Sequence, residues 1–157
     1  LYPWLTELAT RLTAQYQQAR LHHGLLVTAP AGFGKRELAI QLAQNLLCEQ
    51  VNLAQTQQAC GQCKACNLFA GHVHPDYLLL EEENAKSIGV DLVRKLVTKS
   101  QQKAQLAGAQ IYIVPDCERM TEASATRSPS MPLTLRRLSS TAMRSLSAPI
   151  LQVQLGW

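Results

Sequence analysis

The sequence has no apolar run long enough to cross a membrane. Its apolar runs, such as residues 77–80 and 111–114, have the length of buried β-strands. No charged segment followed by an apolar stretch opens the chain, so we expect no secretory signal. The five cysteines are an odd number, which does not suit a framework of disulfides. We therefore expect a cytoplasmic protein with reduced cysteines and no membrane segment.

The sequence also lacks a dense basic region in its first 125 residues. Residues 1–125 contain 11 Lys and Arg and 11 Asp and Glu, so this part of the chain is neutral. The net charge of +4 comes from four arginines further on, Arg127, Arg136, Arg137 and Arg144. A protein that binds DNA by itself usually carries a strongly basic surface. The neutral composition therefore disfavours autonomous DNA binding.

Residues 126–157 differ in composition from the rest of the chain. This segment is rich in Ser and Arg and contains no Lys, Asp, Glu, Asn or His. So abrupt a change indicates a boundary at Ala125. We expect residues 126–157 to form an aberrant tail that is either disordered or translated from a shifted reading frame.

Four cysteines are grouped within the loop 48–66, the last three with the spacing C-x2-C-x2-C; they are Cys48, Cys60, Cys63 and Cys66. Two-residue gaps let the backbone present several sulfurs to one point, as in structural zinc sites. Because protein would fill all four positions, such a metal would hold a loop together and not catalyse a reaction. The further cysteine and proline of a ferredoxin-type iron–sulfur run are absent. We therefore predict a structural Zn²⁺ site and expect the separate Cys117 to be a small core residue.

Helix-like and strand-like patterns alternate along the body of the chain. Apolar residues spaced by three and four predict amphipathic helices at 3–20, 38–47 and 89–105. Short apolar runs predict buried strands at 24–28, 77–80 and 111–114. Strands that alternate with helices are typical of α/β proteins, so we expect a parallel sheet with flanking helices.

The turn between the first strand and the second helix partly matches a phosphate-binding loop. Such a loop needs glycines, a Lys for the phosphates and a Ser or Thr hydroxyl for Mg²⁺. The candidate nucleotide-binding residues of this degenerate loop are Gly32, Gly34 and Lys35, of which Gly34 and Lys35 match the motif. However, Ala29 stands at the first glycine position and Arg36 at the hydroxyl position. Because arginine has no lone pair to offer a cation, magnesium would lose its usual protein ligand.

A second magnesium position is also missing. After the strand at 111–114 a hydrolysing enzyme would have two acidic residues, whereas this chain has Pro115 and then Asp116. Since magnesium and positioning supply most of the catalysis in phosphoryl transfer, we expect no hydrolysis. ATP binding is doubtful but stays open, because the helix N-terminus and Lys35 still offer an anion site. The other interpretation is a simple turn that connects strand to helix.

Several motifs resemble the clamp-loader family of bacterial DNA polymerase III, whose subunits have the AAA+ (RecA-like) fold. They are YPW at 2–4, HHGLL at 22–26, PAGFGK at 30–35, LLC at 46–48, CGQCKAC at 60–66, HPDY at 74–77 and IGVDLVR at 88–94. A four-cysteine zinc loop between the phosphate loop and the second strand is uncommon outside this family. The resemblance implies a partial AAA+ domain over residues 1–125, truncated at its C-terminal side, since the family's later Ser-Arg-Cys motif is absent.

The resemblance also implies a function. Arg36 and Pro115 favour the non-hydrolysing subunit over the ATP-hydrolysing motor subunits (gamma/tau-like). Such a subunit joins the motors and the delta subunit and helps to load the sliding clamp onto primed DNA during replication. We expect no activity of the chain alone, but a place in the polymerase holoenzyme, a nucleotidyltransferase. The alternatives are a motor subunit and a free-standing zinc module that binds nucleic acid.

Overall fold

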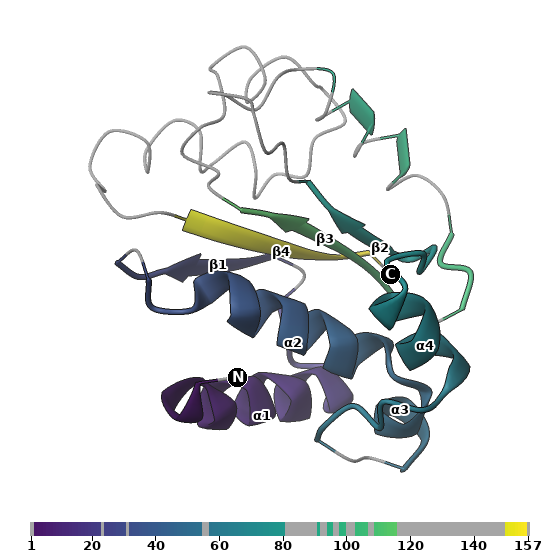
Figure 1. The fold of residues 1–157 in the computed structure, drawn as a ribbon, viewed down its shortest axis with the longest axis horizontal. Coiled ribbons are helices and arrows are strands. Elements are labelled where there is room, and N and C mark those ends of the chain that lie inside the picture. The colour runs from purple at the N-terminus through teal and green to yellow at the C-terminus, as the bar shows by residue number, and fades with distance from the viewer. Residues whose placement is uncertain are drawn as a thin grey trace.

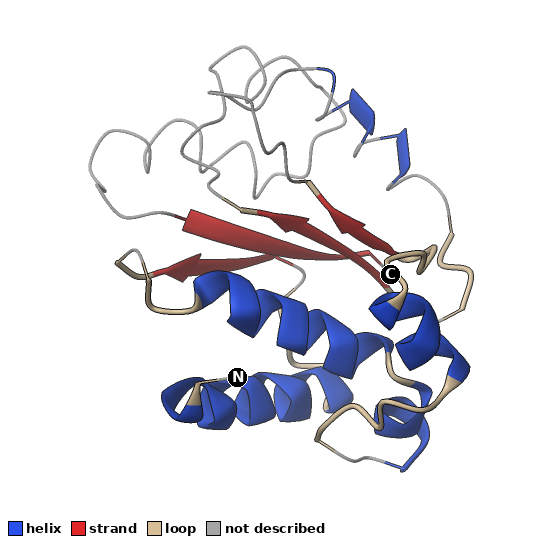
Figure 2. Cartoon of the chain, in the orientation of Figure 1, coloured by secondary structure: helices blue, strands red, loops and turns tan. Residues whose placement is uncertain are grey.

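The computed structural model describes residues 2–22, 24–30, 32–54, 57–80, 91, 94–95, 98–99, 103–106, 109–115 and 150–156. In these residues the elements are, in chain order, α1 (Pro3–Gln17), β1 (Gly24–Thr28), α2 (Lys35–Leu47), α3 (Glu49–Ala54), α4 (Lys64–Ala70), β2 (Tyr77–Leu79), β3 (Gln110–Val114) and β4 (Ile150–Gly156). Figure 1 shows the chain in this order, and Figure 2 separates helices from strands.

The strands form one mixed sheet in the order β1-β4-β3-β2. β2 and β3 are parallel, with Tyr77 opposite Ile111 and Leu79 opposite Ile113. β4 pairs antiparallel with both β1 and β3. Since β1 and β3 both run against β4, the three strands expected from the sequence share one direction. The α/β class and the parallel β2–β3 pair agree with the prediction, whereas the antiparallel β4 does not belong to an all-parallel sheet.

The helices α1 to α4 lie on one side of the sheet in two layers (Figure 1). α2 lies directly against the sheet, and α1 lies on the far side of α2. The core is formed between α2 and the strands, where Leu42 and Leu46 share a buried cluster with Ile111 and Ile113. Burial of each such side chain contributes about 2 kcal/mol to folding. α2 therefore lies between the sheet and the outer layer of helices. It also positions the two segments that lie at its ends.

The predicted helices and strands of the body differ from the observed ones mainly at their ends. α1 ends at Gln17, three residues before the predicted end, and Ala19 follows with a φ of 53°. α2 begins at Lys35, three residues before the predicted start, and ends at Leu47 with Cys48 as its C-cap. The predicted helix at 89–105 lies largely outside the described residues, although positions 91, 94–95 and 98–99 are helical.

Residues 150–156 lie in the segment for which we expected no element. They form β4, which lies between β1 and β3 in the sheet (Figure 1). The sequence carries a signal for this strand, because polar and apolar residues alternate from Gln152 to Leu155. The rest of the segment lies outside the described residues, and so does Cys117, so the domain boundary at Ala125 stays a prediction.

Candidate metal centre and phosphate-type loop

The four cysteines lie together beyond the C-terminal end of α2. Cys48 follows α2, Cys63 caps the N-terminus of α4, and Cys66 lies in the first turn of α4. Their four sulfurs all lie within 4.8 Å of one another. Cys48 Sγ is 3.7 Å from Cys60 Sγ and 3.9 Å from Cys63 Sγ. The structure thus brings together all four predicted ligands.

The spacing of the sulfurs suits a tetrahedral metal site. With metal–sulfur bonds of about 2.3 Å, two sulfurs of a regular tetrahedron are about 3.8 Å apart. The two short distances from Cys48 agree with this value. Cys48 and Cys66 are buried, whereas Cys60 is exposed, so the site lies at the surface. A four-cysteine group of this geometry can bind a metal and is compatible with zinc.

Backbone N–H groups of the loop point at the sulfurs. The amides of Cys60, Cys63 and Cys66 donate to the Sγ atoms of Cys48, Cys60 and Cys63, each at 3.4 Å. Bonds from Gln62 and Cys63 lower the pKa of Cys60 to about 6. Burial raises the pKa of the Cys66 thiol. Since a metal binds the thiolate, the loop favours the ligand form at Cys60, and a metal would have to displace the proton of Cys66.

The phosphate-type loop lies at the other end of α2. Gly34 precedes the helix with a φ of 77°, and Gly32 has a φ of 82°. A Cβ at Gly34 would lie 2.6 Å from the Tyr2 ring and 2.9 Å from Leu5 Cδ1, whereas one at Gly32 would meet nothing within 4 Å. The start of α1 is therefore packed closely on Gly34. Tyr2 in turn stacks on Trp4, with ring centroids 4.7 Å apart.

Lys35 is turned back onto its own loop. Its Nζ donates to the carbonyl of Ala29 at 2.6 Å and to that of Pro30 at 3.5 Å. These carbonyls hold the cation that would contact phosphates in a nucleotide-binding loop. Arg36 occupies the next position, in the first turn of α2, where the magnesium hydroxyl is missing. The loop thus has the backbone shape of a phosphate site, but it lacks the hydroxyl for magnesium and its lysine is bound to carbonyls of the loop.

The two candidate sites are separate. They lie at opposite ends of the 13-residue helix α2, which corresponds to about 20 Å. In the described part of the chain, no side chain is therefore shared between the cysteine cluster and the loop.

The second expected magnesium position is only partly described. Pro115 directly follows β3, as the sequence indicates, whereas Asp116 lies outside the described residues.

A buried polar cluster beside β3 was not predicted. The Asp76 carboxylate accepts the backbone N–H groups of Gln105 and Leu106, each at 2.7 Å. His74 Nδ1 accepts the N–H of Asp76, and burial lowers the pKa of His74. Among the described residues, its buried Nε2 has no hydrogen-bond partner. This cluster connects the segment that leads into β2 with the segment that leads into β3.

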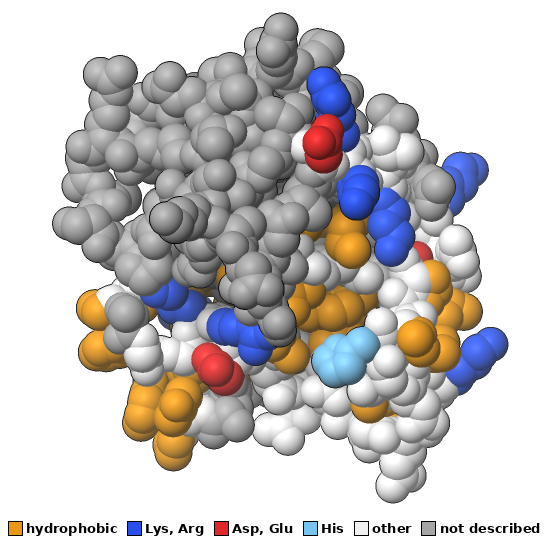
Figure 3. Space-filling model, turned by 45° about the horizontal axis from the view of Figure 1, so that its top comes forward, with side chains coloured by type: hydrophobic (Ala, Val, Ile, Leu, Met, Phe, Trp, Pro, Cys, Tyr) orange, Lys and Arg blue, Asp and Glu red, His pale blue; other side chains and the backbone are white. Residues whose placement is uncertain are grey.

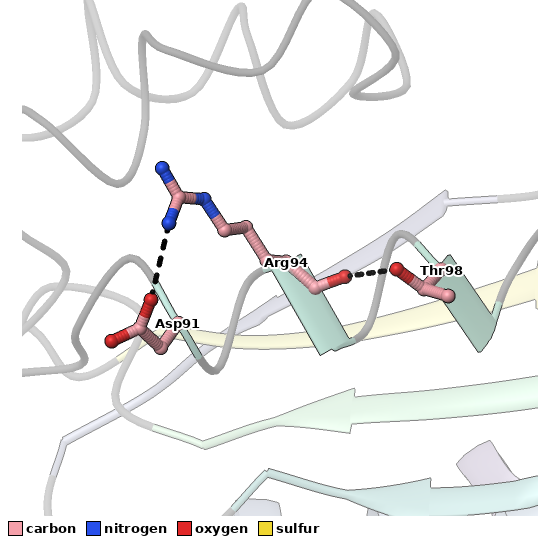
Figure 4. A network of polar contacts seen from close by, with 3 residues as sticks. All are labelled: Asp91, Arg94 and Thr98. Atoms are coloured by element: carbon pink, nitrogen blue, oxygen red, sulfur yellow. Dashed lines mark hydrogen bonds and ion pairs between the residues drawn. The ribbon is translucent and has the colours of Figure 1, made fainter.

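Charged side chains are spread over the face that Figure 3 shows. On this face, Lys and Arg occur in small groups separated by apolar and uncharged side chains. One ion pair, between Arg94 and Asp91 at 3.3 Å, is solvent-exposed (Figure 4). Exposed pairs of this kind contribute at most about 1 kcal/mol. None of the helices in the described ranges combines the length and apolar character that a membrane span requires.

The fold and the two candidate sites define an α/β protein with a phosphate-type loop and, before the strand β2, a four-cysteine group that can bind a metal. The family described as DNA polymerase III, delta subunit, matches residues 4–127. The chain belongs to this family.

Curated relatives agree with the family. The chain is 45% identical over 121 residues to DNA polymerase III subunit delta' of Pseudomonas aeruginosa, with 76% of this chain and 35% of the relative covered. It is 40% identical over 125 residues to the delta' subunit of Escherichia coli, with 79% and 36% covered. It is also 28% identical over 112 residues to the gamma/tau subunit of Mycobacterium tuberculosis, with 71% and 19% covered. The chain spans about a third of the length of the delta' relatives it matches.

Proposed function

We propose that this chain serves as a non-hydrolysing, delta'-type component of the clamp loader of DNA polymerase III. In this proposal it joins the gamma/tau motor subunits and the delta subunit and, through the complex, helps to place the sliding clamp on primed DNA. It would act in the cytoplasm as part of the replicative holoenzyme. The observation that carries the proposal is the match to delta' subunits at 40–45% identity.

The phosphate-type loop supports the passive role. Arg36 replaces the hydroxyl that would bind magnesium, and Lys35 is held by the carbonyls of Ala29 and Pro30. A nucleotide at Gly32, Gly34 and Lys35 would first have to release this lysine. We therefore propose that the loop serves chiefly to connect β1 to α2 and that the chain does not turn over ATP.

We further propose that Cys48, Cys60, Cys63 and Cys66 hold a structural zinc ion. All four positions around such an ion are taken by protein, so it would supply no activated water. Its role would be to fix the loop between α2 and α4, where the described residues form the short helix α3. Elemental analysis of protein prepared without chelator tests this: we expect one zinc per chain, and a content far below one per chain would overturn the zinc site.

Assembly is tested by mixing the full chain with purified gamma/tau and delta subunits from the same organism. We expect the chain to co-elute with the motor subunits on size exclusion, and the motors run alone are the control. Failure to bind any clamp-loader subunit would overturn the proposal. Magnesium-dependent ATP turnover would instead favour a motor subunit. Salt-sensitive DNA binding by the chain alone would favour a free-standing zinc module.

A further inference from the structure

Asn45 is a buried polar residue that touches three separate parts of the protein. It lies in the last turns of α2, three residues before Cys48, and is only 2% exposed. Its Nδ2 donates to Thr13 Oγ1 of α1 at 3.2 Å and to the carbonyl of Gln57 at 3.3 Å. Its Oδ1 accepts from the N–H of Ala59 at 3.0 Å and from Gln41 Nε2 at 3.1 Å. The Asn45 side chain therefore contacts α1, α2 and the loop of residues 48–66, which we call the metal loop.

These four bonds use the complete capacity of the amide. An asparagine side chain offers two donors and two lone pairs, and all four are engaged. Because a buried amide is destabilised when it loses such partners, this arrangement holds Asn45 in one orientation. The same orientation fixes two backbone groups of the metal loop, at Gln57 and Ala59. The carbonyl of Asn45 also accepts the N–H of Cys48, at 3.3 Å.

The position of these bonds along the chain matters for the metal site. Ala59 immediately precedes Cys60, the exposed ligand, and packs against the buried cluster of Cys48, Val51 and Cys66. Beside Asn45 the loop is not closely packed on the helices, because a pocket of about 280 Å³ opens there. Its lining residues are Thr6, Ala9, Thr10, Gln41, Asn45 and Gln58. At this place the approach of the loop to α2 thus depends on hydrogen bonds more than on apolar contact.

We propose that Asn45 is a positioning residue for the metal loop, which holds Gln57 and Ala59 so that Cys60 is presented to the other three sulfurs. This inference rests on the proposed zinc site. Residues that orient metal ligands without touching the metal commonly change its affinity by about 10- to 100-fold. Asn45 would act in this way through the backbone of the loop.

The test measures how fast zinc leaves the full chain. Protein loaded with one zinc per chain is mixed with excess chromophoric chelator at neutral pH, and release is followed by absorbance. We expect Asn45→Ala to release zinc about 10- to 100-fold faster than the wild type. Cobalt-substituted Asn45→Ala should keep the absorption bands of four-thiolate coordination, because all four ligands remain.

Two variants separate positioning from general destabilisation. Thr13→Val removes the bond from Asn45 to α1 but leaves both of its bonds to the loop, so we expect zinc release near the wild-type rate despite lower stability. Asn67→Ala is the matched control, because Asn67 also donates to the loop, to the carbonyl of Gln62 at 3.2 Å, but at an exposed position. We expect it to leave the release rate unchanged. Asn45→Ser undergoes the same measurement, so that the test does not depend on the folding of one variant.

The outcomes are distinct. Faster release from Asn45→Ala alone supports the positioning role. A wild-type rate in folded Asn45→Ala or Asn45→Ser overturns it, and so does equal acceleration by Thr13→Val, since the effect would then come from loosened helices. If the wild-type chain takes up no zinc, the proposed zinc site fails, and this inference fails with it.

Discussion

At the scale of single residues, Gly34 is a position where both the backbone angle and the neighbouring side chains favour glycine. It combines a φ of 77° with a close approach of Tyr2 and Leu5. Left-handed backbone is costly for residues with a Cβ, and crowding adds to that cost. Gly32 has nearly the same backbone angle, with a φ of 82°, but open space around it. Substitutions at Gly34 and Gly32 can therefore be compared to distinguish the cost of backbone strain from the cost of steric overlap.

We predict that Gly34→Ala lowers the free energy of unfolding by about 3 kcal/mol and Gly32→Ala by about 1–2 kcal/mol. The difference reflects the overlap with the Tyr2 ring and Leu5, which only the first variant creates. Urea unfolding followed by circular dichroism measures both. Equal losses in the two variants would show that the start of α1 does not pack on the loop.

Tyr112 gives a prediction about high pH. Burial raises its pKa to about 12, and the nearby Asp76 carboxylate adds to the effect. An unfolded tyrosine ionises near pH 10, so above this pH the unfolded state loses protons that the folded state keeps. The stabilisation is present below pH 10, and we expect it to be lost as the pH rises to about 12, at a cost on the order of 2 kcal/mol.

Denaturant unfolding between pH 8 and 12 tests this expectation. Tyr112→Phe loses the hydrogen bond to Gln110 Oε1 and is less stable at pH 8, but its stability should fall less steeply above pH 10. Tyr2→Phe, at an exposed position, is the control and should keep the wild-type slope. If Tyr112→Phe also keeps the wild-type slope, Tyr112 does not titrate differently in the folded state.

The sequence reveals some of these residues and not others. The cysteines are predictable because their spacing alone limits how four sulfurs can meet, and the structure brings them within 4.8 Å. Asn45 is not predictable, because in the sequence it is one of several polar residues of an amphipathic helix. Its partners Thr13 and Ala59 are 32 and 14 residues away. Its role follows only from the three-dimensional structure, in which α1 and the metal loop both pack against this part of α2.

At the scale of elements, we expect the order of the metal loop to depend on a bound ligand more than that of the sheet does. Between α2 and α4 it contains the six-residue helix α3, and its residues Cys48 and Val51 form a small buried cluster with Cys66 of α4. The sheet and α2 have a larger apolar core of their own. The loop and the sheet should therefore respond differently to loss of metal.

We predict that chelation of zinc speeds amide hydrogen exchange in residues 48–66 before it does so in β3. Metal binding and folding are coupled where a site is not preformed, so the loop should open locally while the core persists. Exchange read by mass spectrometry, with and without chelator, measures both segments in one sample. Simultaneous loss of protection in the loop and in β3 would mean that the metal holds the whole fold.

The regular elements follow from the sequence to different degrees. α1, α2 and the three strands of the body have apolar patterns of sufficient length, and they occur where predicted, to within three residues at their ends. α3 and α4 have six and seven residues, too few for a helical period to stand out. β4 has an alternating pattern, but its place between β1 and β3 depends on strands more than 30 residues away in the chain.

At the scale of the whole molecule, α2 relates the two candidate sites. The phosphate-type loop lies at its start and the cysteine cluster at its end. The start lacks the groups for magnesium, whereas the end keeps a complete set of metal ligands. The molecule therefore combines an α/β fold and an incomplete phosphate-type loop with a four-cysteine group that can bind a metal. This division agrees with a static part in a larger assembly.

The central claim is that the chain does not hydrolyse ATP, and phosphate release measures this most directly. The purified full chain is incubated with ATP and Mg²⁺, beside Lys35→Ala and a sample without protein. We predict that wild type and Lys35→Ala both release phosphate at the rate of the blank. Steady magnesium-dependent release by the wild type, abolished in Lys35→Ala, would contradict the account.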